Sequence, residues 1–174
     1  MIALIFDTET TGIPRHPRAK EQPRIIEWGG ALVDSDGAVL RELDLLIDPE
    51  EPLEAIITKI TGLTDEALAG QPKFAEVIPQ LREMFSAADA VVAHNLPFDS
   101  TLMELELARA GIAEWPWPAR QICTVQEHAE EWGRRPKLLE LYEHYVGEKL
   151  EQKHRALDDV MALAAVARAS GVLL

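Results

Sequence analysis

The chain opens with an apolar run from Ile2 to Phe6, which leads directly into Asp7 and Glu9 and then a turn at Gly12. A short apolar run of branched residues closed by glycine is typical of a buried central strand. Because side chains alternate along a strand, Asp7 and Glu9 project from one face next to the core. The opening therefore predicts a buried strand with two carboxylates held side by side at its end.

Crowding and partial burial both disfavour the charged form of such a pair unless positive charge lies close by. A hard divalent cation, which takes oxygen ligands, is the usual compensation. The alternative is that Asp7 and Glu9 only mark where a strand emerges into solvent. A functional interpretation therefore needs partners further along the chain.

The composition bounds the answer. A length of 174 residues predicts one domain spanning 1–174, and 47% apolar residues indicate a globular protein. No apolar run is long enough to cross a membrane, and no signal peptide precedes the first strand. The lone Cys123 excludes an internal disulfide framework and a cysteine zinc cluster. We expect a cytoplasmic, reducing environment.

The net charge of -13 argues against binding of nucleic acid through a broad basic surface, but it permits metal-assisted handling at one place. One basic island interrupts the acidic chain between Ile13 and Glu27, where Glu21 and Glu27 oppose Arg15, Arg18, Lys20 and Arg24, with His16 in addition. Such an island is either solvated surface or, since it follows the first strand, a steering element for phosphate groups.

Apolar spacing and turn residues predict the elements that follow. A strand interrupted at Gly29-Gly30 and a returning strand form a hairpin, and three short helices come next, the third distorted by Pro79. The two strands are expected at 24–34 and 38–47. The first helix is expected at 53–60, the second begins after its cap residue Thr64, and the third is expected at 74–85.

A second buried strand at 89–93 leads into a helix that runs to about Ala110, with Asn95 or Leu96 at its cap. Pro97 suits the first helical position, and Asp99 falls in the first turn. The helix dipole alone explains a carboxylate there. Its place beside the end of a strand, where ligands bind in open α/β sheets, makes Asp99 a candidate ligand as well.

The remaining ranges are a strand at 121–125, an amphipathic helix at 138–146 and an alanine-rich helix ending near residue 169. Between them, Trp115 and Trp117 lie in a proline-rich loop, where packing is favoured over base stacking.

His154 precedes the last helix, which begins with two adjacent acids, Asp158 and Asp159. Asp159 shares the core-facing stripe with Leu163 and Val166, whereas Asp158 does not. The spacing favours Asp159 as the functional carboxylate, with His154 on the loop before the helix.

These parts together predict one chemistry. Four converging carboxylates require cations, and two divalent ions are the economical solution. Such ions can bind a phosphodiester and activate water, and a histidine beside them can take the proton of that water near neutral pH. We therefore predict metal-assisted hydrolysis of a phosphodiester.

Three segments, Asp7–Gly12, His94–Asp99 and His154–Asp159, resemble in order the exonuclease motifs of the DEDDh 3'-to-5' exonucleases. This DnaQ-like family includes the proofreading epsilon subunit of bacterial DNA polymerase III. The segment Ile60–Glu66 is similar to the family's HGIT segment, with Thr61 where histidine is common.

The resemblance implies an α/β, ribonuclease H-like fold with a five-stranded mixed sheet flanked by helices. It implies that Asp7, Glu9, Asp99 and Asp159 hold two Mg²⁺ or Mn²⁺ ions and that His154 is the general base. It also implies substrate contacts along the first motif and support from the second, which gives Thr8, Thr10, Thr11, Gly12, Ile13, Asn95 and Phe98 as candidate substrate-binding residues.

We expect a stand-alone 3'-to-5' exonuclease that acts on single-stranded ends, DNA rather than RNA, and releases nucleoside 5'-monophosphates. An RNA-trimming or oligoribonucleotide-degrading enzyme of the same family is the nearest alternative. A catalytically silent nucleic-acid-binding subunit is a further one. The expected partner is a single-stranded 3' end, without a membrane; a polymerase or a replication or repair protein is left open as a second partner.

Overall fold

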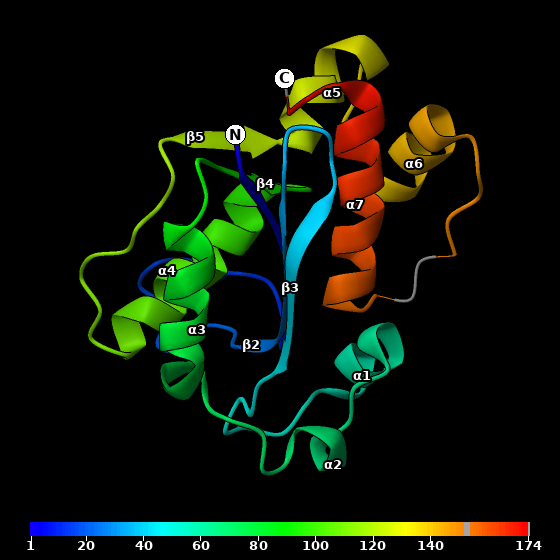
Figure 1. The fold of residues 1–174 in the computed structure, drawn as a ribbon. Helices are drawn as coiled ribbons and strands as arrows, with labels where there is room; N and C mark the ends of the chain where they lie inside the picture. The colour runs from blue at the N-terminus through cyan, green and yellow to red at the C-terminus, as the bar shows by residue number, and fades with distance from the viewer. Residues whose placement is uncertain (152–153, 174) are drawn as a thin grey trace.

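The computed structural model describes residues 1–151 and 154–173. A five-stranded mixed sheet lies at its centre in the order β3-β2-β1-β4-β5, with helices on both faces (Figure 1). The sheet expected from the sequence is therefore confirmed. Its strands are β1 (Ala3–Thr10), β2 (Ile25–Val33), β3 (Val39–Leu46), β4 (Ala90–Ala93) and β5 (Arg120–Cys123).

Strand β1 is the middle strand, as its apolar opening predicts. It pairs antiparallel with β2, where Glu9 lies opposite Glu27, and parallel with β4. The run from Ala3 to Phe6 is fully buried. The strand continues to Thr10, so Asp7 and Glu9 lie within its second half, where the ladder to β2 fixes their positions and the pairing with β4 has already ended at Ile5.

Two helical layers bury the two faces of the sheet, as Figure 1 shows. On one face, α3 (Phe74–Ser86) and α4 (Leu96–Arg109) pack on alternate strand residues such as Leu4 and Phe6. On the other, α6 (Leu138–Val146) and α7 (Ala156–Ser170) pack on Ala3 and Ile5. This alternation places Asp7 and Glu9, which continue the Ala3 and Ile5 series, on the face that α7 covers.

The remaining helices are α1 (Ala55–Thr61), α2 (Asp65–Leu68) and α5 (Thr124–Trp132). The predicted cap of α2 is confirmed, because the Thr64 side chain accepts a hydrogen bond from the Ala67 amide. Helix α3 runs through Pro79 as one element. No helix in the described ranges is long and apolar enough to cross a membrane.

Two local expectations are wrong. The last strand ends at Cys123, and Thr124 and Val125 instead open α5, a helix that the sequence analysis missed. The Gly29-Gly30 pair does not interrupt β2, which pairs with both neighbours through these residues.

The two glycines are needed for different close contacts, one on each face of the sheet. A Cβ on Gly29 would lie 2.5 Å from the Leu157 amide nitrogen, so the backbone of the first turn of α7 rests on the strand. A Cβ on Gly30 would lie 2.3 Å from the Trp28 ring, which packs over this position. Trp28 stacks on Phe6 in turn, and Trp115 and Trp117 pack edge-on against Phe85.

Gly29→Ala should lower the free energy of unfolding by about 2 kcal/mol, because the added methyl group meets backbone rather than a flexible side chain. Urea denaturation measures the change. Gly12→Ala is the matched control, since its Cβ would meet only the Pro23 Cβ at 3.9 Å. Equal stability of the two variants would contradict the close seating of α7 on β2.

Candidate active site

Three elements bring the predicted acidic residues together at one end of the sheet. Strand β1 carries Asp7 and Glu9, helix α4 carries Asp99 in its first turn, and helix α7 carries Asp159 in its first turn. The charges of Asp99 and Asp159 both act on the carboxyl groups of Asp7 and Glu9. The structure thus brings together carboxylates from three segments, with Asp99 92 positions after Asp7 and Asp159 60 positions after Asp99.

Thr8 fixes Asp99 from the face of β1 opposite to Asp7 and Glu9. Its amide and its hydroxyl both donate to Asp99 Oδ1, at 3.1 and 2.8 Å. Thr8 and Asp99 are both buried. Burial raises the pKa of Asp99 to about 7, although the hydrogen bonds from Thr8 favour its charged form.

The third motif supplies a histidine and a carboxylate close to Glu9. Ligand atoms of Glu9, His154 and Asp159 lie within 4.8 Å of one another. Asp159 is buried, with 6% of its surface exposed, whereas Asp158 is exposed. His154 is exposed and adopts a positive φ of 51°, immediately before the helix begins. The helical stripe that favoured Asp159 over Asp158 is therefore the buried one.

The crowded carboxylates of β1 are difficult to ionise without added positive charge. The pKa of Asp7 lies well above its ordinary value, because of burial first and then the negative charges of Asp99 and Glu9. Burial, followed by the charges of Asp159 and Glu27, raises the pKa of Glu9 to about 8.

Sequence analysis missed two residues at this site, Glu27 and Arg155. Glu27 lies on β2 directly opposite Glu9 and is completely buried. The Arg155 guanidinium holds it with donor-acceptor distances of 2.6 to 3.1 Å. The available signal was a charged residue inside an otherwise apolar strand, since such a residue is rarely buried without a partner.

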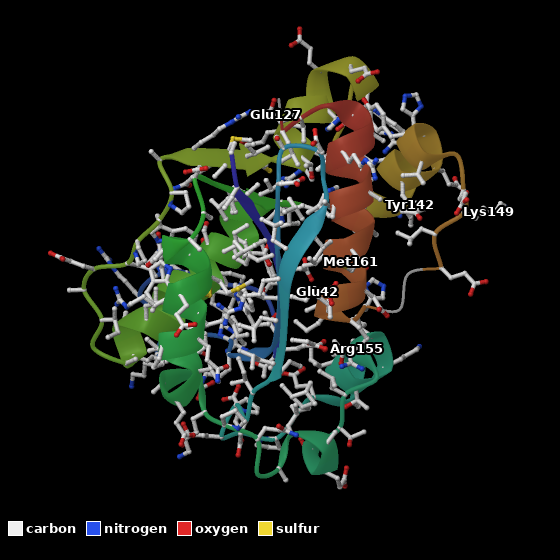
Figure 2. All side chains as sticks on the ribbon, in the orientation of Figure 1. Glu42, Glu127, Tyr142, Lys149, Arg155 and Met161 are labelled. Carbon is white, nitrogen blue, oxygen red and sulfur yellow. The ribbon has the colours of Figure 1, made fainter. Side chains whose placement is uncertain are left out.

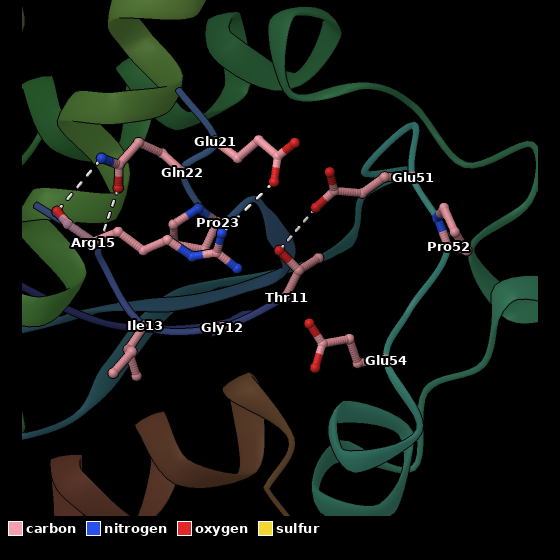
Figure 3. Close-up of a pocket in the computed structure, with 10 residues that line it drawn as sticks. All are labelled: Thr11, Gly12, Ile13, Arg15, Glu21, Gln22, Pro23, Glu51, Pro52 and Glu54. Atoms are coloured by element: carbon pink, nitrogen blue, oxygen red, sulfur yellow. Dashed lines mark hydrogen bonds and ion pairs between the residues drawn. The ribbon is translucent and has the colours of Figure 1, made fainter. Parts of the chain in front are cut away.

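The residues after Glu9 form the wall of a neighbouring cavity of about 260 Å³, drawn in Figure 3. Thr10 is buried and donates to the Gly12 carbonyl at 2.7 Å. Thr11 donates to Glu51 Oε1 at 3.0 Å across the cavity. Ile13 is 76% exposed and lines the same cavity.

The second motif is held by neighbours on other elements. Asn95 caps α4 with a positive φ of 75°, and its side-chain oxygen accepts from Arg135 at 2.5 Å. Phe98 is partly buried against the α3 and α4 core. Burial lowers the pKa of His94 to about 4, and its Nδ1 lies 3.0 Å from the Thr124 hydroxyl, so His94 is a structural, neutral histidine.

The basic residues between Ile13 and Glu27 differ in whether they form ion pairs. Arg24 is partly buried and forms ion pairs with buried Glu106 at 3.3 Å and with exposed Glu50 at 3.2 Å. Arg15 lies 3.7 Å from Glu21, and both are exposed. In the described part of the chain no salt bridge involves Arg18 or Lys20, so these two residues are the best candidates for steering phosphates.

A family model described as Exonuclease (RNase_T) matches residues 4–167, a range that contains all three motifs. The chain belongs to this exonuclease family. The resemblance of its motifs to the DEDDh, DnaQ-like group is thereby confirmed.

Relatives agree with this membership over different lengths. A DNA polymerase III of the PolC type from Clostridium perfringens is 29% identical over 96% of this chain but only 11% of its own length. The DNA polymerase III epsilon subunit of Treponema pallidum is 35% identical over 59% of this chain and 45% of its own. This exonuclease-family chain thus spans less than half the length of either relative.

The fold has counterparts among solved structures. The nuclease domain of 3'hExo, described as a DEDDh family member bound to rAMP, superposes with a TM-score of 0.77. The match covers 96% of this chain and 90% of that domain at 16% identity. At that identity the likeness shows the fold, and the expected ribonuclease H-like architecture is confirmed.

In the metal-free protein, the free energy of unfolding should fall as pH rises from about 5 to 9. The pKa of Glu9, raised to about 8, means that the folded state keeps a proton that the unfolded chain has lost. That stabilisation is complete below the ordinary pKa and disappears as pH passes the folded value. Urea denaturation in chelator measures the slope, and excess Mg²⁺ should flatten it.

Glu9→Gln should show a shallower slope, whereas Glu42→Gln, which changes an exposed residue of β3, should keep the slope of the unmodified protein. Identical slopes for all three proteins would contradict carboxylate repulsion at this site.

Proposed function

We propose that this chain is a metal-dependent 3'-to-5' exonuclease that hydrolyses phosphodiester bonds at single-stranded 3' ends and releases nucleoside 5'-monophosphates. We also propose that residues 1–174 act as one exonuclease domain. The observation that carries the proposal is the convergence of Asp7, Glu9, Asp99 and Asp159 on one end of the sheet. Their shared negative charge suits cations and phosphate chemistry better than any role in stability.

The donor set fits two hard divalent ions. Carboxylate oxygens are the ligands that Mg²⁺ and Mn²⁺ prefer, and burial with mutual repulsion leaves these groups short of positive charge. Asp7, Glu9, Asp99 and Asp159 would hold the ions. When bound, the ions supply the charge that stabilises the phosphoryl oxygens and the leaving oxygen during an in-line displacement.

Residues of the chain itself account for proton transfer and positioning. His154 is exposed beside Glu9 and Asp159, where its ring can take a proton from the attacking water. Thr8 keeps Asp99 in place, so its part is support for a ligand rather than contact with the nucleotide.

The exposed Ile13 and the backbone from Thr10 to Gly12 offer a seat for the terminal nucleotide. Asn95 and Phe98 hold the start of α4 beside it.

DNA is the favoured substrate because the relatives named above are parts of DNA polymerase III. RNA is the second candidate because the 3'hExo domain is described as bound to rAMP. A time course on a single-stranded DNA oligomer labelled at its 5' end, beside an RNA of the same sequence, separates the two.

With Mg²⁺ or Mn²⁺, the DNA should shorten stepwise from its 3' end and release mononucleotides, faster than the RNA, and chelator should stop both reactions. Faster shortening of RNA would reverse the substrate assignment. Tight binding of either oligomer without shortening would favour a silent binding subunit.

Asp159→Asn should lower kcat by roughly 100-fold or more, beyond the loss typical of groups that only support a ligand. Asp158→Asn is the matched control on the adjacent, exposed position and should keep most of the activity. Initial rates on the labelled oligomer measure both variants. The opposite ranking would show that Asp158 is the functional acid of α7.

A further inference from the structure

Glu27 accepts hydrogen bonds from both of the residues that follow His154. Arg155 Nε donates to Glu27 Oε1 at 2.9 Å and to Oε2 at 3.1 Å, and Arg155 Nη2 donates to Oε1 at 2.6 Å. The Ala156 amide donates to Oε2 at 3.1 Å. Figure 2 shows Arg155 at the start of α7. One buried carboxylate of β2 therefore holds the beginning of the third motif.

This arrangement caps α7 from a distant strand. Arg155 is the N-cap residue of α7 and its side chain makes no cap hydrogen bond, so the Glu27 carboxylate takes over that role at the first helical amide. The positive end of the helix dipole favours a negative charge at this position. Glu27 and Arg155 are separated by 128 positions in sequence, so their contact fixes the position of α7 on the sheet as well as supporting the start of the helix.

Gly29 completes the seat on the same face of β2, two residues after Glu27. A side chain there would meet the Ala156 carbonyl carbon at 2.6 Å and the Leu157 nitrogen at 2.5 Å. Glu27 therefore holds the first turn of α7, and Gly29 lets that turn lie directly on the strand. Glu27 lies opposite Glu9 in the β1–β2 ladder, so the contact with Glu27 fixes the first turn of α7 relative to the first motif.

We propose that Glu27, acting through Arg155 and Ala156, is a positioning residue that sets where His154 and Asp159 stand relative to Glu9. The inference rests on the proposed function of this site, and it names a residue outside the three motifs. His154 directly precedes Arg155 in the chain. Asp159 lies one helical turn after Arg155, and its amide donates to the Arg155 carbonyl at 3.0 Å.

The Arg155 guanidinium also explains how a further carboxylate is tolerated here. The negative charge of Glu27 acts unfavourably on Asp7 and Glu9, while the positive charge of Arg155 acts favourably on Glu9. Glu27 accepts from Arg155 and Ala156 and also shares a side-chain hydrogen bond with Asp44 of β3. Holding Glu27 requires both the charge of Arg155 and the planar, two-nitrogen geometry of its guanidinium. Lysine would keep the charge but not the geometry.

The test compares Glu27→Gln and Arg155→Lys with the unmodified full chain. Isothermal titration with MnCl₂ alone gives the cation affinity, and initial rates on the labelled DNA oligomer in Mn²⁺ separate kcat from KM. Both variants should weaken Mn²⁺ binding and lower kcat by about 10- to 100-fold, with KM for the oligomer nearly unchanged. Amide exchange in peptides covering 156–160 should become roughly tenfold faster.

Glu106→Gln is the matched control for a purely structural loss. Glu106 is equally buried, contacts Arg109 at 3.1 Å and accepts from the Ile25 amide at 3.1 Å, but it lies near the end of α4. This variant should lose thermal stability to a similar extent while Mn²⁺ affinity and kcat stay within about twofold of the unmodified values.

Unchanged Mn²⁺ affinity and unchanged kcat in folded Glu27→Gln would overturn the positioning role and leave Glu27 a structural residue. If that variant does not fold, Arg155→Lys decides the question with the same measurements. If the unmodified chain releases no mononucleotide from DNA or RNA, the proposed function fails. In that case the Mn²⁺ affinities and amide exchange still decide whether Glu27 positions the third motif.

Discussion

Repulsion between buried carboxylates is the constraint on which the active end of this fold depends. Asp7 and Glu9 are fixed in the central strand, and Asp99 and Asp159 are brought against them by two different helices. Burial, followed by the negative charges of Asp159 and Glu27, raises the pKa of Glu9 to about 8. A protein that keeps such an arrangement gives up stability at neutral pH, and cations bound by these groups would offset the loss.

The rest of the architecture holds these groups at the required separation. The ladder of β1 with β2 sets the first motif, the pairing of β1 with β4 holds the strand just before it, and two hydrogen bonds from Thr8 bind Asp99 to the same strand. Glu27 and Gly29, on β2, do the corresponding work for α7 through hydrogen bonds and close backbone approach. Neighbouring strands thus position the helical motifs, and the ordinary hydrophobic layers behind them make the sheet rigid.

Local patterns in the sequence predicted the features that depend on local physics. The apolar run before Asp7 predicted the central strand, and the stripe shared with Leu163 distinguished buried Asp159 from exposed Asp158. The contacts that single residues of β2 make with α7 were not predicted. Glu27 was counted only as an acid within a basic island, because its partner Arg155 is 128 positions away.

The glycines of β2 were misread for the same reason. The Gly29-Gly30 pair is typical of a break in a strand, but here Gly29 makes room for the backbone of α7 and Gly30 makes room for the Trp28 ring. Helix α5 was missed because it follows β5 directly after Cys123, with no side-chain cap to mark its start.

The central claim, that the carboxylate cluster holds two cations, is tested most directly by anomalous diffraction from a crystal soaked in Mn²⁺ with a nucleoside monophosphate. The account predicts two Mn²⁺ peaks bounded by Asp7, Glu9, Asp99 and Asp159; peaks absent from this cluster, or bound instead by Glu27, would contradict it.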